Sequence, residues 1–161
     1  MSIPFNADEV FEMAEQIERN GARFYRASAK KFPQVSSLML ELAAMEDEHE
    51  KTFKAMRAEL SGEEVDPPVY DPDDEAQMYL RVMADGHVFE IKTDPVEKLS
   101  KKASVIDVLK MAIGMEKDSI AFYVGLKESV SAKAGKNKIE NIIKEEFSHI
   151  TILGKKMQEL H

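Results

Sequence analysis

The chain has 161 residues, of which 43% are hydrophobic and 32% charged, with only 7 glycines and 6 prolines. These proportions are typical of one soluble, largely helical domain with a sizeable core. The formal charge of −8 and the lack of a long apolar segment argue against nucleic acid and membranes as partners. The sequence has no cysteine, which excludes disulfides, thiolate metal sites and iron–sulfur clusters within it. Because its start also lacks a signal-peptide pattern, we expect a cytoplasmic protein.

The first part of the sequence predicts two long helices. Asn6 followed by Glu9 is a capping-box pattern, and apolar residues at helical spacing then predict helix A over about 7–31. Pro33 interrupts this pattern. A second apolar stripe predicts helix B over about 34–60.

The segment 61–103 has a different character. It is rich in proline and aspartate and predicts loop with one short helix, with Asp71 as its cap, Pro72 as its first residue and Gly86 as its stop. Such a long connection is unusual inside a compact domain. It is explained if the third long helix starts at the end of a bundle opposite to where helix B finishes.

The last part of the sequence predicts two more long helices. Ser104 and Asp107 form a second capping-box pattern, which predicts helix C over about 105–130. A cap at Asn137 predicts helix D over about 138–160. Four helices with apolar stripes predict an all-α four-helix bundle, made of two helical hairpins joined by the long crossover and forming a single domain.

The sequence also repeats itself. The segment from Ile17 to Tyr25 matches the segment from Met115 to Tyr123, and the offset between their glutamates is 98 residues (116 − 18). Two Glu-x-x-His pairs lie 100 residues apart (146 − 46). The repeat predicts two hairpins related by a pseudo-twofold axis, each contributing the same polar residues.

These repeated polar residues are candidate metal ligands: Glu18, Glu46, His49, Glu116, Glu146 and His149. A glutamate and a histidine three residues apart share one helix face, and both pairs fall on apolar stripes, where an unpaired charge is costly. Counted from the turns, the glutamates come to about the same height in the bundle. Four buried carboxylates without cations would repel one another. Carboxylate and imidazole donors suit iron or manganese, and zinc is also compatible.

Other polar residues have less specific interpretations. Tyr25 and Tyr123 lie on the faces of the candidate ligands, where they either donate a hydrogen bond to a ligand carboxylate or simply fill the core. Glu145 lies four residues before His149 and could compete with Glu146 as its partner. Surface positions are expected for Glu15, Glu48, Glu145, His87 and His161. The alternative for His87 is that it covers the metal site.

The ligand pattern resembles that of the ferritin-like di-iron carboxylate proteins, and within them the rubrerythrin-like group. The resemblance implies a ferritin-like bundle that holds two iron ions bridged by Glu46 and Glu146. It also implies terminal ligands from the remaining glutamates, and one histidine on each ion: Glu18, Glu116, His49 and His149. Because rubrerythrins reduce hydrogen peroxide, often as dimers, we expect hydrogen peroxide or dioxygen as the substrate and a homodimer as the assembly.

Two departures from this group are visible. Rubrerythrins carry a cysteine-ligated rubredoxin domain that feeds electrons to the iron centre, whereas this sequence has no cysteine. An external electron-donor protein is therefore expected. Rubrerythrins also have a further metal-binding glutamate one turn after the helix C ligand, and Ser119 stands at that position here. The serine implies a more symmetric site, without the redox-linked iron shift of the rubrerythrin cycle.

Three functions fit these residues. The first is a non-haem di-iron oxidoreductase that reduces hydrogen peroxide or dioxygen with electrons from an external donor. The second is a ferroxidase or iron-storage protein, for which storage would need a large oligomer. The third is a non-catalytic helical interaction module, with or without structural metal.

Overall fold

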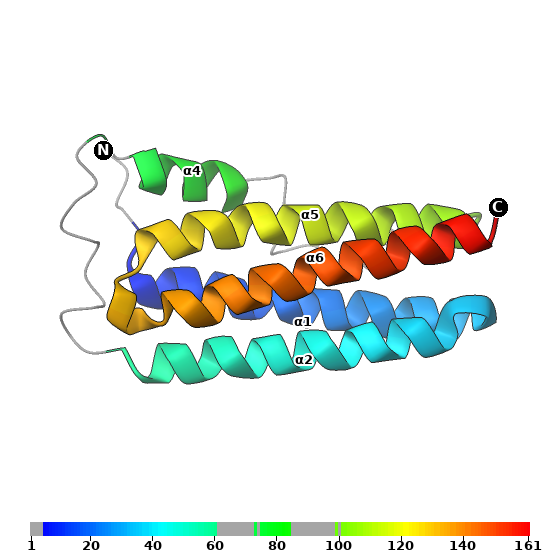
Figure 1. Ribbon diagram of the computed structural model, residues 1–161, viewed down its shortest axis with the longest axis horizontal. Helices are drawn as coiled ribbons and strands as arrows, with labels where there is room; N and C mark the ends of the chain where they lie inside the picture. The colour runs from blue at the N-terminus through cyan, green and yellow to red at the C-terminus, as the bar shows by residue number, and fades with distance from the viewer. Residues whose placement is uncertain (1–4, 61–72, 74, 85–98, 100) are drawn as a thin grey trace.

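The structure, a computed structural model, describes residues 5–60, 73, 75–84, 99 and 101–161. Four long helices lie side by side and form an all-α bundle, as predicted (Figure 1): α1 (Ala7–Lys31), α2 (Ser36–Ala58), α5 (Val105–Ser129) and α6 (Lys136–Glu159). A shorter helix, α4 (Glu75–Ala84), packs against α5.

The bundle consists of two antiparallel hairpins. Helix α1 packs on α2 and helix α5 packs on α6, with short 3-10 turns between the partners at Pro33–Val35 and Ala132–Ala134. Helix α5 begins at the end of the bundle opposite to the end of α2 (Figure 1). This arrangement is the one expected from the length of the connection between the hairpins.

Three predicted helix starts can be compared with the structure. The capping boxes at Asn6 and Ser104 are both present. The predicted cap at Asn137 is wrong, because α6 begins at Lys136 directly after Gly135, without a side-chain cap. Gly135 adopts a left-handed conformation with φ 97°, which favours glycine, and this turn starts the helix earlier than a polar cap would.

The predicted signals of the short crossover helix lie mostly outside the described residues. This is so for Asp71, Pro72 and Gly86, and also for His87. The described part of α4 is held by Leu80, which is fully buried, and by the Tyr79 hydroxyl, which donates a hydrogen bond to the Ala121 carbonyl at 2.5 Å. Helix α4 is therefore anchored on α5.

Two apolar clusters fill the bundle and leave a layer between them. One cluster includes Phe11, Phe53 and Phe122 together with the start of α6, and the other includes Phe24 and Leu109 together with the start of α2. On each long helix, the residues between its contributions to the two clusters form a central layer. This central layer contains the candidate ligands.

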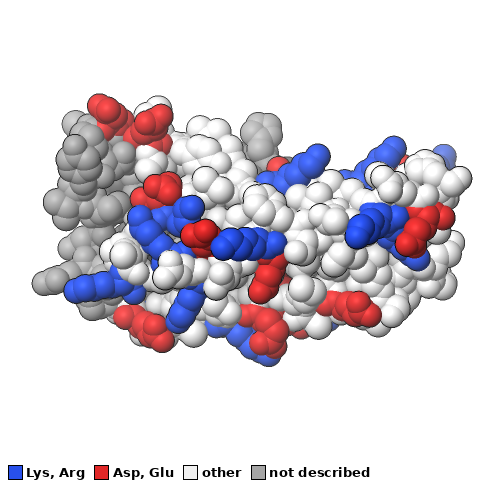
Figure 2. All heavy atoms as spheres, in the orientation of Figure 1, with Lys and Arg blue, Asp and Glu red and all other residues white. Residues whose placement is uncertain are grey.

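The outside of the bundle carries charged side chains of both signs. Figure 2 shows acidic and basic side chains interspersed over the visible face. None of the described helices is long and apolar enough to cross a membrane.

Candidate metal centre

The central layer brings the six candidate ligands together from all four long helices. Helices α1 and α5 each contribute one glutamate, and helices α2 and α6 each contribute a glutamate and a histidine. No member is more than 4% exposed: Glu18, Glu46, His49, Glu116, Glu146 and His149. We call this set the carboxylate–histidine cluster.

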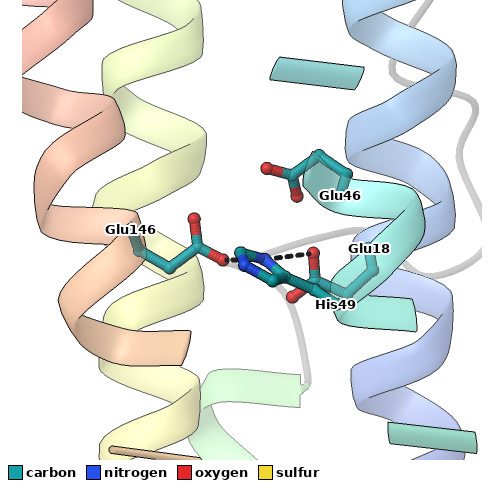
Figure 3. A group of neighbouring side chains, drawn as sticks. All are labelled: Glu18, Glu46, His49 and Glu146. Atoms are coloured by element: carbon teal, nitrogen blue, oxygen red, sulfur yellow. Dashed lines mark ion pairs between the residues drawn. The ribbon is translucent and has the colours of Figure 1, made fainter. Parts of the chain in front are cut away.

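The cluster divides into two ligand groups that share two members. One group contains Glu18, Glu46, His49 and Glu146, with ligand atoms all within 4.8 Å of one another (Figure 3). The other group contains Glu116 and His149 together with the same Glu46 and Glu146. Two shared carboxylates between two outer sets form the arrangement that two adjacent cations need.

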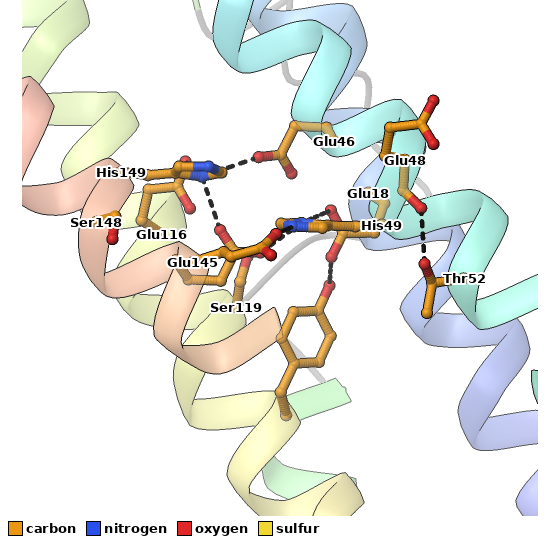
Figure 4. Close-up of polar contacts among 12 residues, drawn as sticks. Glu18, Glu46, Glu48, His49, Thr52, Glu116, Ser119, Glu145, Ser148 and His149 are labelled. Atoms are coloured by element: carbon orange, nitrogen blue, oxygen red, sulfur yellow. Dashed lines mark hydrogen bonds and ion pairs between the residues drawn. The ribbon is translucent and has the colours of Figure 1, made fainter. Parts of the chain in front are cut away.

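Both imidazole rings direct the same nitrogen at the carboxylates. The Nδ1 atom of His49 lies 3.4 Å from Glu18 Oε2 and 3.2 Å from Glu146 Oε1. The Nδ1 atom of His149 lies 2.9 Å from Glu146 Oε2, 3.2 Å from Glu46 Oε1 and 3.4 Å from Glu116 Oε1. The rings stack with centroids 5.7 Å apart and planes at 18° (Figure 4). The cluster thus preserves the pseudo-twofold symmetry of the sequence.

Several buried atoms of the cluster approach one another without hydrogen-bond geometry. Among the described residues this holds for Glu18 Oε2, Glu46 Oε1, both carboxylate oxygens of Glu146 and the Nδ1 atoms of both histidines. Buried polar atoms normally have hydrogen-bond partners, and atoms that converge without them are what ligands of a shared cation require. The residues therefore fit two metal ions, with oxygen and nitrogen donors that suit iron or manganese.

The two tyrosines link the hairpins through the cluster. Tyr25 of α1 donates its hydroxyl to Glu116 of α5, and Tyr123 of α5 donates its hydroxyl to Glu18 of α1. Both tyrosines are buried, and burial followed by the neighbouring carboxylates raises their pKa well above 10, so both keep the proton they donate. Hydrogen bonding to a candidate ligand is thus the role that the structure shows for them.

Burial and mutual repulsion favour the protonated form of three of the four glutamates. Burial first, and then the charges of Glu46 and Glu116, raise the pKa of Glu146 to about 8. Burial and the charges of Glu18 and Glu116 raise the pKa of Glu46 well above its usual value. Burial and the charge of Glu146 raise the pKa of Glu18 as well. For Glu116, burial alone would raise the pKa, but its contacts with His149, Glu146 and Tyr25 together outweigh burial, and the pKa is lowered.

The imidazoles carry compensating positive charge. Burial alone would lower the pKa of His49, but its contacts with Glu146 and Glu18 raise it to about 12. For His149, contacts with Glu116, Glu146 and Glu46 overcome burial and also raise its pKa to about 12. A cluster that binds protons this strongly has the electrostatic character of a cation site.

The neighbouring acidic residues only partly follow the predictions. Glu48 is exposed, as expected, and pairs with Lys51. The surface prediction is wrong for Glu15, which is 7% exposed because it lies beneath Arg57 of α2, with Nη1 and Oε1 3.5 Å apart. His161 is exposed, as expected.

Glu145 has a role that the sequence interpretation missed. Its side chain is 53% exposed, but instead of competing with Glu146 it reaches across to His49, whose Nε2 lies 2.5 Å from Glu145 Oε2. Gly21 was also missed. A Cβ atom there would lie 2.9 Å from Glu46 Oε2, so the absence of a side chain makes room for a shared carboxylate. The only signal for Glu145 was its place beside the Glu-x-x-His pair.

The fold and the carboxylate–histidine cluster together define a ferritin-like di-iron carboxylate protein. A crystal structure from Thermotoga maritima, described as that of a ferritin-like diiron-carboxylate protein, is similar with a TM-score of 0.78 and 26% sequence identity, over 100% of each chain. The rubrerythrin family model matches residues 9–157, and the chain belongs to the rubrerythrin family. No curated protein sequence matches it.

Proposed function

We propose that the protein is a non-haem di-iron oxidoreductase that reduces hydrogen peroxide or dioxygen. The observation that carries this proposal is the sharing of Glu46 and Glu146 between two buried ligand groups. Two carboxylates placed this way would hold two metal ions close enough to act on one small oxidant. Membership of the rubrerythrin family supports iron as the metal.

The proposed reaction balances with two electrons and two protons. When bound, two ferrous ions would each supply one electron, so that hydrogen peroxide and two protons become two water molecules. The sequence contains no cysteine for a rubredoxin-type iron site, so we assign the supply of electrons to a separate donor protein.

The chain itself contributes position, charge and a dry environment. The hydroxyls of Tyr25 and Tyr123 hold Glu116 and Glu18 in place from the opposite hairpin. Phe53 and other members of the apolar clusters close the layer above and below, which limits access of water to the reacting atoms. With metal bound in place of the protons of the cluster, four ionised carboxylates and two neutral imidazoles would contribute net negative charge that offsets the charge of the cations.

The test is a stopped-flow comparison of the two oxidants. The protein is loaded with ferrous ion under nitrogen and mixed with hydrogen peroxide or with dioxygen, and iron oxidation is followed by absorbance. Oxidation by peroxide that is much faster than that of free ferrous ion supports a peroxidase. A preference for dioxygen would identify an oxidase or ferroxidase instead. Oxidation no faster than that of free ion with either oxidant would refute the proposal.

A matched variant identifies where the reaction occurs. Glu46→Gln alters a shared ligand with little change in volume, and it should abolish the fast phase, which is the iron oxidation that exceeds the rate of free ferrous ion. Glu48→Gln makes the same chemical change two residues away on the exposed face of α2, and it should leave the fast phase unchanged.

A further inference from the structure

The two histidines of the cluster differ at the nitrogen that faces away from the carboxylates. His49 Nε2 lies 2.5 Å from the Glu145 carboxylate (Figure 4). His149 Nε2 is buried and has no hydrogen-bond partner among the described residues. The outer surroundings of the cluster are therefore unequal, although its inner geometry is nearly symmetric.

The internal repeat shows how the sequence produces this difference. His149 and Glu146 follow His49 and Glu46 by 100 residues, and the same offset pairs Glu145 with Met45 (145 − 45). A thioether is at most a weak acceptor, whereas a carboxylate is a strong one. The chain thus provides a carboxylate for one imidazole and an apolar side chain at the equivalent position of the other half.

The contact fixes both the tautomer and the orientation of His49. An ionised carboxylate can only accept hydrogen bonds, so His49 Nε2 carries the hydrogen and donates it to Glu145. When a metal ion replaces the second ring proton, the lone pair of Nδ1 would be free for that ion, on the side of the ring that faces Glu18 and Glu146. A carboxylate at the outer nitrogen also makes the imidazole a more basic metal ligand. Because Glu145 belongs to α6 and His49 to α2, the contact joins the two hairpins.

We propose that Glu145 is a positioning residue for His49 and makes the His49 side of the cluster the tighter of two metal positions. The inference deepens the proposed function and rests on its metal centre. Glu145 itself is 53% exposed and is absent from both ligand groups. Its effect therefore acts through His49 and is confined to one of the two ions.

The test is an equilibrium titration with ferrous ion under nitrogen, in which binding is measured by calorimetry. Wild-type protein should bind in two steps of different affinity. Glu145→Ala should weaken the tighter step by about 10-fold to 100-fold and leave the other unchanged. Glu145→Gln keeps a neutral acceptor, so its affinity in the tighter step should lie between those of the wild type and Glu145→Ala. Glu48→Ala is the control, because Glu48 is exposed, adjacent to His49 in the sequence and paired with Lys51.

A spectroscopic measurement assigns the effect to one position. Mössbauer spectra of the diferrous wild-type protein should show two iron environments, of which Glu145→Ala changes only one. Equal weakening of both steps, or no weakening, in a variant whose metal-free unfolding matches wild type would overturn the role of Glu145 and leave the metal centre standing. Wild-type protein that binds no ferrous ion would overturn both proposals.

Discussion

Replacement of Gly21 by alanine should separate the stability of the fold from the geometry of the metal centre. A methyl group at this position would lie 2.9 Å from Glu46 Oε2, whereas ordinary contacts begin at 3.4 Å. The carboxylate must therefore move by at least about 0.5 Å (3.4 − 2.9), which is the tolerance of a metal or catalytic site. The end of a flexible side chain can make this shift at little cost to folding.

The substitution should raise the stability of the fold and lower the affinity for metal. Alanine in place of glycine inside a helix stabilises the fold by up to about 1 kcal/mol, or about 2–4 °C in Tm for a chain of this size. Because Glu46 belongs to both ligand groups, both ferrous ions should bind at least about tenfold more weakly, which corresponds to about 1.4 kcal/mol each. Without metal, the Gly21→Ala protein should be at least as stable as the wild type. In a titration with ferrous ion, it should bind both ions more weakly than the wild type.

The assays are thermal unfolding of the metal-free protein and anaerobic titration with ferrous ion. Gly114→Ala is the matched control, because Gly114 lies in α5 with nothing within 4 Å of its added Cβ. This control should gain the same helix stability and bind metal normally. A Gly21→Ala protein that binds two ions with wild-type affinity would refute the reasoning.

Three further predictions concern the contacts of the cluster and the contact between α4 and α5. Tyr25→Phe and Tyr123→Phe each remove a donor to a buried carboxylate and should lower the unfolding free energy of the metal-free protein by about 1–3 kcal/mol in denaturant titrations; no change would argue against these bonds. The metal-free protein should unfold at lower temperature as the pH rises from about 5 to 9. The raised pKa values of Glu146 (about 8) and His49 (about 12) mean that the folded state binds more protons than the unfolded state over this range, so folding becomes less favourable as protons are removed. Stability that rises over this range would contradict the pKa shifts. Gly125→Ala places a Cβ atom 2.5 Å from a ring of α4, so it should accelerate proteolysis of α4 without changing metal stoichiometry, and wild-type resistance to protease would show that α4 is not held there.

Much of the cluster could be predicted because helix geometry converts spacing directly into position. Glutamate and histidine three residues apart must share a face, and the offset between the halves places equivalent residues at equal height. The capping boxes at Asn6 and Ser104 were equally predictable, because their hydrogen bonds are local in sequence. Such features depend on one helix or one turn at a time.

The features that could not be predicted depend on contacts between helices. Glu15 looks like a surface residue until Arg57 of α2 is placed above it. The partner of Glu145 lies 96 residues away on α2, and nothing in its own helix indicates that it reaches there rather than toward His149. At the start of α6, the left-handed turn at Gly135 replaced the expected cap at Asn137. Tertiary packing decided the first two cases, and the local backbone conformation of Gly135 decided the third.

The most direct test of the central claim is the metal content of protein loaded with ferrous ion under nitrogen and then desalted. The account predicts about two iron ions per chain, one for each ligand group, and a loss of both in Glu46→Gln. Iron retained at far below one ion per chain, or an iron content that Glu46→Gln leaves unchanged, would contradict the assignment of the carboxylate–histidine cluster as a dinuclear metal centre.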